Sequence, residues 1–195
     1  MKVITTMAAV LLLLKGAITM AADTDKVAVI ETKLGKMVVE FYDTDAPKTV
    51  ANFQKLTTDG FYNGTAFHRV IPGFMIQGGD PLSKQDPRGG SVGTGGPGYT
   101  VPAEIKRDHN RGTLATARLG GSMNPKKDSS GSQFFINVKD NDFLNGDYTV
   151  FGNVIAGMDV ADKIVSVPRD GRDNPNEPLV MTKVTLATRA EALKK

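Results

Sequence analysis

The sequence predicts a mainly β domain, a barrel or sandwich with helices over its open ends. Apolar runs of strand length recur about eight times and are separated by glycine, proline and other turn residues. Only two segments repeat apolar residues at the spacing of an amphipathic helix. The 21 glycines and 10 prolines favour many turns and short strands over a helical bundle.

Short strands are expected along the whole chain. The first two, 27–32 and 36–42, are joined by a hairpin turn at Lys33-Leu34-Gly35. Two more flank the turn at Pro72-Gly73. The others are expected at 112–119, 133–138, 148–155 and 180–186.

Two helices are expected among these strands. The first begins at Pro47, because proline is favoured in the first helical turn. Its apolar residues Val50, Phe53 and Leu56 recur three apart and form one narrow stripe. The second helix is expected at 158–165, after the strand at 148–155.

The chain contains no repeat, linker or second domain that the sequence reveals. Residues 23–188 are therefore expected to form one domain, followed by a polar tail at 189–195. Residues 1–22 are predicted to be a secretory signal peptide.

The predicted signal peptide has the three usual parts. Lys2 supplies the positive start, 10–14 is apolar, and small residues precede a cleavage point after Ala21 or Ala22. Lys15 shortens the apolar run, which is too short to span a bilayer. Export to the bacterial periplasm is expected, and a cytoplasmic chain with an N-terminal extension is the alternative.

The composition excludes several classes of function. The chain has no cysteine, which excludes disulfides, thiol catalysis and thiolate metal sites. With only two histidines, a histidine-based zinc site is not expected either. Without Lys2 and Lys15 of the leader, the 24 basic residues become 22 against 21 acidic ones. This balance does not favour nucleic-acid binding.

The stretch 67–80 organises the chain. It reads Phe-His-Arg-Val-Ile-Pro-Gly-Phe-Met-Ile-Gln-Gly-Gly-Asp, two apolar runs around a Pro-Gly turn. Because side chains alternate along a strand, Arg69 shares a face with Ile71, and Gln77 shares one with Met75. An arginine on an apolar strand is costly to bury unless it is paired or used. The alternative is a surface arginine on a half-exposed strand, and a second stretch downstream favours a functional Arg69. His68 is expected to be structural.

The following segment, 78–98, holds eight glycines and contains the dinucleotide pattern G-x-G-x-x-G. Pro97 removes a backbone donor from that pattern, and Tyr99-Thr100-Val101-Pro102 cannot open a helix. We interpret it as a long surface loop instead. His109, in a charged loop, is expected to be solvated.

Four stretches together resemble the cyclophilin family of peptidyl-prolyl cis-trans isomerases. They are 67–80, Gly112-Thr113-Leu114, 131–136 and Val150-Phe151-Gly152, and the resemblance extends from about Val27 to Leu186. It implies a closed eight-stranded antiparallel barrel capped by two helices, with a substrate groove on its outer face. It also implies an enzyme that needs no cofactor and no metal.

The resemblance assigns roles by motif position. Arg69 is similar to the catalytic arginine, and Gln77 to the donor that holds the substrate backbone. The implied substrate-binding residues are Phe74, Met75, Ala117, Arg118, Gln133, Phe135, Phe143, Leu144 and Tyr148.

Three of these positions differ from many family members. Arg118 stands where asparagine is frequent, so only its backbone contacts transfer. Tyr148 replaces a histidine, and Phe143 replaces a tryptophan that is frequent in eukaryotic members. The last change predicts weak affinity for cyclosporin, because phenylalanine lacks the indole N–H.

The implied reaction makes and breaks no covalent bond, since it rotates an X-Pro amide. The expected partners are proline-containing peptides and unfolded protein clients, with no nucleic acid and no metal, and the chain is expected to be a monomer. The alternative function is a proline-peptide binding module or chaperone with little turnover.

Overall fold

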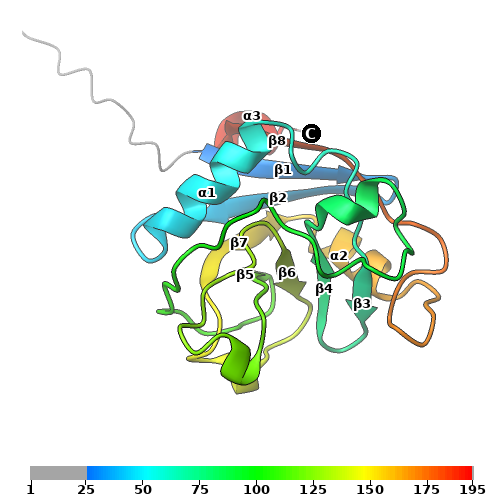
Figure 1. Cartoon of the computed structure of the whole chain (residues 1–195). Helices are drawn as coiled ribbons and strands as arrows, with labels where there is room; N and C mark the ends of the chain where they lie inside the picture. The colour runs from blue at the N-terminus through cyan, green and yellow to red at the C-terminus, as the bar shows by residue number, and fades with distance from the viewer. Residues whose placement is uncertain (1–25, 195) are drawn as a thin grey trace, which may run out of the picture.

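The computed structural model describes residues 26–194. The predicted signal peptide, residues 1–22, lies outside the described residues, as do the first three residues of the predicted domain. Within the described part, one antiparallel sheet of eight strands forms the body of the molecule (Figure 1).

The strands alternate with loops of very different length. Their order in the sheet is β3-β4-β6-β5-β7-β2-β1-β8, and every neighbouring pair is antiparallel. The strands are β1 Lys26–Thr32, β2 Gly35–Phe41, β3 Arg69–Ile71, β4 Met75–Gly78, β5 Thr113–Thr116, β6 Phe134–Asn137, β7 Val150–Ala156 and β8 Met181–Thr188. Each of the eight expected strands is thus confirmed, with shifted ends.

The expectation of a closed barrel is wrong, because the sheet is an open, curled half-barrel. Its edge strands β3 and β8 do not pair. Within residues 26–194, an isolated bridge between Ala66 and Val180 joins the segments that precede them. The three residues of β3 offer little edge, and the Val70 N–H on it donates to the carbonyl of Asp173 at 2.8 Å. A loop therefore occupies the edge that closure would need.

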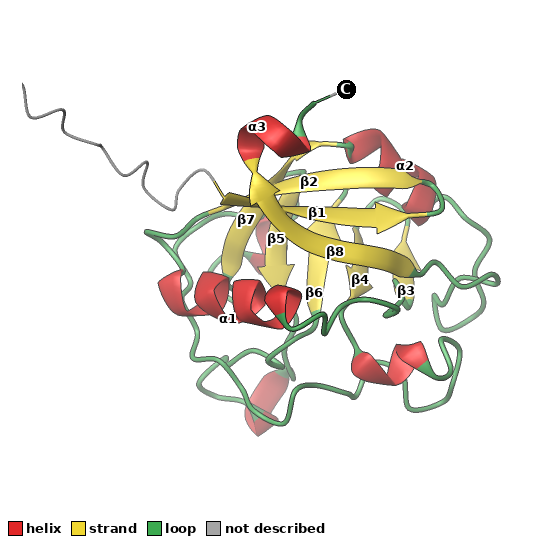
Figure 2. Ribbon diagram, turned by 90° about the horizontal axis from the view of Figure 1, so that it is seen from above, coloured by secondary structure: helices red, strands yellow, loops and turns green. Residues whose placement is uncertain are grey.

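Two main helices lie at opposite ends of the curled sheet (Figure 2). They are α1, Pro47–Thr58, and α2, Met158–Val165. Both confirm the predicted helices, and the predicted stripe of Val50, Phe53 and Leu56 is buried. Among residues 26–194, short 3-10 helices lie in loops at Pro81–Lys84, Gly121–Met123 and Asp142–Leu144.

The main core lies inside the curl of the sheet. The ring of Phe53 packs 4.8 Å from that of Tyr62, 5.5 Å from that of Phe134 and 5.4 Å from that of Phe151, measured between centroids. These four aromatic rings come from α1, from the chain after it, and from two strands. They fill the interior and bind the helix to the sheet.

A second apolar cluster lies on the other face of β4, β5 and β6. It contains Met75, Ala115, Phe135, Leu144 and Val150. Successive residues of a strand point to opposite faces, so Phe134 enters the main core while Phe135 enters this cluster. The outer face of the sheet is therefore apolar where a surface would ordinarily be polar.

The segment 189–195, for which the sequence predicts a polar tail, begins with a short helix, α3 Arg189–Ala192. The Thr188 hydroxyl and the Glu191 carboxylate cap each other's backbone N–H groups there. Ala192 is buried against Val27 and Val38.

Among residues 26–194, no helix is long and apolar enough to cross a membrane.

Candidate active site

A cavity of about 330 Å³ opens over the second apolar cluster; we call it the Arg69 cavity. Nine of the eleven residues that the sequence assigns to the site line it: Arg69, Phe74, Met75, Gln77, Ala117, Arg118, Phe135, Leu144 and Tyr148. They come from three strands and three loops. Gln133 and Phe143 do not line this cavity.

Arg69 lies at the start of β3 and is exposed. Its guanidinium makes no hydrogen bond or ion pair with any residue between 26 and 194. Across the ladder it is the Cα partner of Gln77, and Ile71 is the partner of Met75. These four side chains therefore share one face of the sheet. The alternation predicts the pair within each strand, and the register of the ladder joins the two pairs. All donors of Arg69 remain available to a ligand.

A chain of amide hydrogen bonds fixes Gln77. Its Nε2 donates to Oε1 of Gln133 at 3.0 Å. Nε2 of Gln133 in turn donates to the carbonyl oxygens of Gly95 at 2.8 Å and Gly93 at 3.0 Å. Gln133 thus positions Gln77 and anchors the glycine-rich loop. The amide oxygen of Gln77 keeps no partner among the described residues, so a ligand N–H can use it.

The buried carboxylate of Asp80 holds the same loop from below. It accepts hydrogen bonds from the backbone N–H groups of Leu82, Gly93 and Gly95. Asp80 is fully buried, and these bonds replace its lost hydration. The segment that the sequence describes only as a surface loop is therefore anchored at the cavity.

The floor of the cavity is apolar. Met75, Phe135 and Leu144 are buried, with 1%, 5% and 8% of their surface exposed. The ring of Phe135 meets that of Tyr148 edge-on, with centroids 5.8 Å apart. Such a floor can take up a ring of modest size and exclude water from it.

His109 lies under this floor, which corrects the expectation that it is solvated. It is fully buried, and its ring stacks on Phe135 with centroids 5.8 Å apart. Nδ1 lies 3.2 Å from Nδ2 of Asn137. Burial lowers the pKa of His109, and the charged form is disfavoured. The charged residues next to His109 in the sequence suggested a solvated loop, but they could not reveal its contact with Phe135, which is distant in the sequence.

Arg118 forms the wall between this cavity and a neighbouring hollow. Its guanidinium lies 4.5 Å above the ring of Tyr148, and Nε donates to the Asp147 carbonyl at 2.7 Å. Only 9% of its side chain is exposed. Arg118 therefore orients Tyr148 and has few donors left for a ligand.

The neighbouring hollow, about 590 Å³, lies between the glycine-rich loop and residues 119–130; we call it the Met123 hollow. Gln133 lines it, together with Gln77, Ala117 and Arg118 from the Arg69 cavity. Phe143 belongs to neither space. Its side chain is exposed and lies over Phe74, with ring centroids 5.4 Å apart.

Sequence reasoning missed several lining residues of the Arg69 cavity. They are His68, Gly89, Val92, Gly93, Arg172 and Asn174. His68 is 5% exposed, and neither of its ring nitrogens has a hydrogen-bond partner in the described structure. The position of His68 next to Arg69 in the sequence could have indicated that it lines the site, whereas nothing in the sequence around Arg172 did.

Residues 26–194 contain no group of three or more acidic or histidine side chains that could hold a metal.

Comparison with known proteins decides the family. Residues 27–186 match the family model described as cyclophilin type peptidyl-prolyl cis-trans isomerase/CLD. The chain belongs to the cyclophilin family. It is therefore of an enzyme class that needs no cofactor.

Relatives of this cyclophilin are found in bacteria and in yeast. A peptidyl-prolyl cis-trans isomerase of Synechococcus elongatus is 44% identical over 149 residues, which cover 72% of this chain and 93% of the relative. Peptidyl-prolyl cis-trans isomerase B of Bacillus subtilis is 46% identical over 129 residues, covering 65% and 80%. The isomerase ppi1 of Schizosaccharomyces pombe is 40% identical over 157 residues, covering 79% and 94%.

A solved structure agrees with this cyclophilin's fold. The cyclophilin type isomerase of Cryptosporidium parvum, determined in the presence of the dipeptide Ala-Pro, superposes with a TM-score of 0.72 at 30% identity. The match covers 83% of this chain and 99% of the other.

Proposed function

We propose that this cyclophilin accelerates rotation about X-Pro bonds by means of Arg69, with the proline ring held on the floor of the Arg69 cavity. The observation that carries the proposal is a guanidinium, unpaired within the described residues, beside an apolar floor. The expected partners are proline-containing peptides and unfolded protein clients, whose folding the enzyme assists.

The reaction is accelerated by stabilising the proline nitrogen in the transition state. Amide resonance gives the X-Pro bond a rotation barrier of roughly 18–20 kcal/mol. In the twisted transition state the proline nitrogen regains a lone pair that it lacks in the planar amide. A hydrogen bond from Arg69 to that nitrogen stabilises the twisted form more than the planar one. Differential stabilisation of this kind is what accelerates a reaction.

The size of this effect is limited. A hydrogen bond to a charged group contributes about 1.5–3 kcal/mol, and about 1.36 kcal/mol corresponds to a tenfold rate change. Arg69 thus supplies one to two powers of ten. We assign the rest of the rate acceleration to the apolar floor around Phe135. This floor removes water from the amide and holds the proline ring while the rest of the peptide turns. The resemblance implies that Gln77 holds the substrate backbone as a donor, but its Nε2 already donates to Oε1 of Gln133. Gln77 therefore faces the substrate backbone with its free amide oxygen, which is an acceptor.

The decisive experiment is an isomerisation assay on an Ala-Pro or Gly-Pro peptide with residues 23–195. We expect turnover that a chelator leaves unchanged. Arg69→Ala should remove most of it, whereas Arg107→Ala, which breaks an ion pair with Asp45 outside the cavity, serves as the control. Peptide binding with no turnover would instead identify a binding module or chaperone. Loss of activity on chelation would contradict the proposal.

We also propose that the chain is exported and that its first 21 or 22 residues are removed. Lys2, the apolar run at 10–14 and the small residues before Ala22 support this. Mass spectrometry of the protein from its native cell should find a start at residue 22 or 23. A protein that keeps Met1 and stays in the cytoplasm would contradict export.

A further inference from the structure

The loop between α2 and β8 docks on the outer edge of β3. The backbone N–H of Val70 donates to the carbonyl oxygen of Asp173, and in Figure 1 this loop, in orange, lies beside β3. Arg69 and Arg172 are the chain neighbours of this bonded pair, and both line the Arg69 cavity. The docked loop therefore adds a second guanidinium to the wall that carries Arg69.

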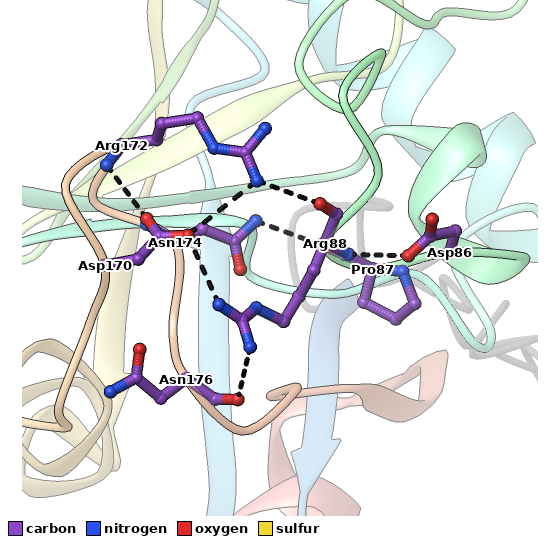
Figure 3. A network of polar contacts seen from close by, with 7 residues as sticks. All are labelled: Asp86, Pro87, Arg88, Asp170, Arg172, Asn174 and Asn176. Carbon is purple, nitrogen blue, oxygen red and sulfur yellow. Dashed lines mark hydrogen bonds and ion pairs between the residues drawn. The ribbon is translucent and has the colours of Figure 1, made fainter.

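Hydrogen bonds from two loops hold Arg172 in place, as Figure 3 shows. One guanidinium nitrogen of Arg172 donates to the carbonyl of Arg88 at 3.0 Å, and its backbone N–H donates to the Asp170 carboxylate at 2.9 Å. Asn174 ties the same loops through a hydrogen bond of 3.0 Å to the Pro87 carbonyl. These contacts fix the backbone that presents Arg172, so little ordering is needed on binding.

The charges at this end of the cavity do not balance. Among the described residues, three arginines line the Arg69 cavity and no acidic residue does. Arg69 has no partner within the same part of the chain. Arg172, with 59% of its side chain exposed, lies 3.7 Å from Asp170, a carboxylate that Arg88 also contacts at 3.4 Å. Two guanidinium groups thus share one carboxylate.

Other acidic groups near the cavity are engaged elsewhere. The Asp80 carboxylate is buried and is used by backbone N–H groups. The Asp147 carboxylate lies 3.5 Å from Arg118 and 2.8 Å from Lys127, so it pairs with these two side chains. His68 adds a buried ring, without a partner in the described structure, to the wall of the Arg69 cavity. The positive charge is therefore local, in a chain whose formal charge is only +3.

We infer that the Arg69–Arg172 end of the cavity binds a carboxylate, and that the enzyme prefers proline peptides with an acidic side chain close to the proline. This specificity rests on the proposed function. A carboxylate between two guanidinium groups makes charge-assisted hydrogen bonds, which are stronger than neutral ones. Because both arginine side chains are exposed, salt screens this attraction, and the preference should weaken as the salt concentration rises.

The test uses short peptides with an acetyl and an amide cap, because free termini would carry charges of their own. The reference has Ala-Pro at its centre and Gln two residues before and two residues after the proline. Glu or Lys then replaces each Gln in turn. Isomerisation is measured by NMR exchange, and affinity by calorimetry. At one of the two positions we expect Glu to exceed Gln about 3- to 10-fold in kcat/KM at low salt, and Lys to fall below Gln.

Two variants separate Arg172 from the rest of the site. Arg172→Gln should bring the Glu-to-Gln ratio close to one, and Arg172→Glu should reverse the preference in favour of Lys. Lys163→Gln removes a positive charge from the outer face of α2, where Lys163 pairs with Asp159, and should keep the ratio. Melting curves check that each variant is folded.

The outcomes are distinct. A ratio near one at both positions in the unmodified enzyme would overturn the inference, as would a ratio that persists in Arg172→Gln. If the Arg172 variants do not fold, the unmodified enzyme decides, because the ratio must shrink as salt is raised to about 0.5 M. If no peptide is turned over, the proposed function fails, and calorimetry still shows whether Glu binds more tightly than Gln.

Discussion

Arg69 and Gln77 are direct partners across the antiparallel ladder of β3 and β4. Directly opposite residues place their side chains on the same face of a sheet. The candidate catalytic cation and the amide that can hold a peptide backbone are therefore side by side over the apolar cluster. The pairing of β3 with β4 around the Pro-Gly turn places these two side chains next to each other.

Arg69→Ala should affect the rate and leave stability almost unchanged. The side chain is exposed and has no partner among the described residues, so its removal breaks no contact in the free enzyme. Both kcat and kcat/KM should fall about 10- to 100-fold. Arg69→Lys should restore only part of the rate, because an ammonium lacks the planar fork. Turnover, peptide titration and melting curves check this. A parallel loss of affinity or stability would identify Arg69 as a binding or structural residue.

Phe135→Ala should lower both stability and peptide affinity. The ring is buried between His109 and Tyr148, so its removal leaves a cavity under the proposed proline site. The free energy of unfolding should fall by roughly 3–5 kcal/mol. Urea denaturation and calorimetry measure the two effects. Phe143→Ala is the control, since that ring is 70% exposed, and it should cost far less stability.

Gly131→Ala should destabilise the segment that leads into β6. Gly131 has φ +86°, and a Cβ there would overlap the carbonyl oxygen of Tyr99. We expect a loss of about 2–4 kcal/mol, from backbone strain and overpacking. Gly120→Ala is the matched control, because a Cβ at that position would meet no atom within 4 Å and its φ is −90°. Equal melting temperatures for the two variants would contradict this account.

Stability should fall when the pH drops from about 7.5 to about 5. Burial lowers the pKa of both His68 and His109, so the folded state takes up their protons at a lower pH than the unfolded state, in which histidine titrates near pH 6.5. The unfolded state then binds more protons, and folding becomes less favourable by up to about 1.4 kcal/mol per pH unit for each histidine.

Urea denaturation across this range measures the slope. His109→Gln should reduce the slope, because only His68 then titrates in this way. Four carboxyl groups also have lowered pKa values in the folded protein: Asp147, Asp159, Asp170 and Glu191. Carboxyl groups of an unfolded chain have pKa values near 4, so these four change the stability only at a pH below this window. A stability that is flat between pH 5 and about 7.5 would show that neither histidine titrates as proposed.

Phe143→Trp should tighten cyclosporin inhibition. The family resemblance implies that an indole N–H at this position donates to the drug, and the exposed ring of Phe143 over Phe74 leaves room for a larger one. One hydrogen bond contributes about 0.5–1.5 kcal/mol, or roughly a 2- to 10-fold lower inhibition constant. Phe143→Leu supplies a side chain without a donor. If both variants bind the drug equally well, the missing hydrogen bond is not the cause.

The sequence by itself determined what depends on neighbouring residues. The period-two alternation of 67–80 placed Arg69 with Ile71 on one face of the first strand and Gln77 with Met75 on one face of the second, and the register of the two strands brings both pairs to the same face. The stripe of Val50, Phe53 and Leu56 placed the inner face of α1 for the same reason. A local pattern is sufficient where backbone geometry alone decides which way a side chain points.

Only the tertiary structure decided the contacts between distant segments. In it the sheet is open, since β3 does not pair with β8, and the Val70 N–H on the edge of β3 donates to the carbonyl of Asp173 in a loop. It buried His109 under Phe135 and brought Arg172 to the cavity that Arg69 lines. These contacts depend on how the loops fold back over the sheet. Such contacts leave no repeating pattern in the sequence, so they cannot be predicted from it.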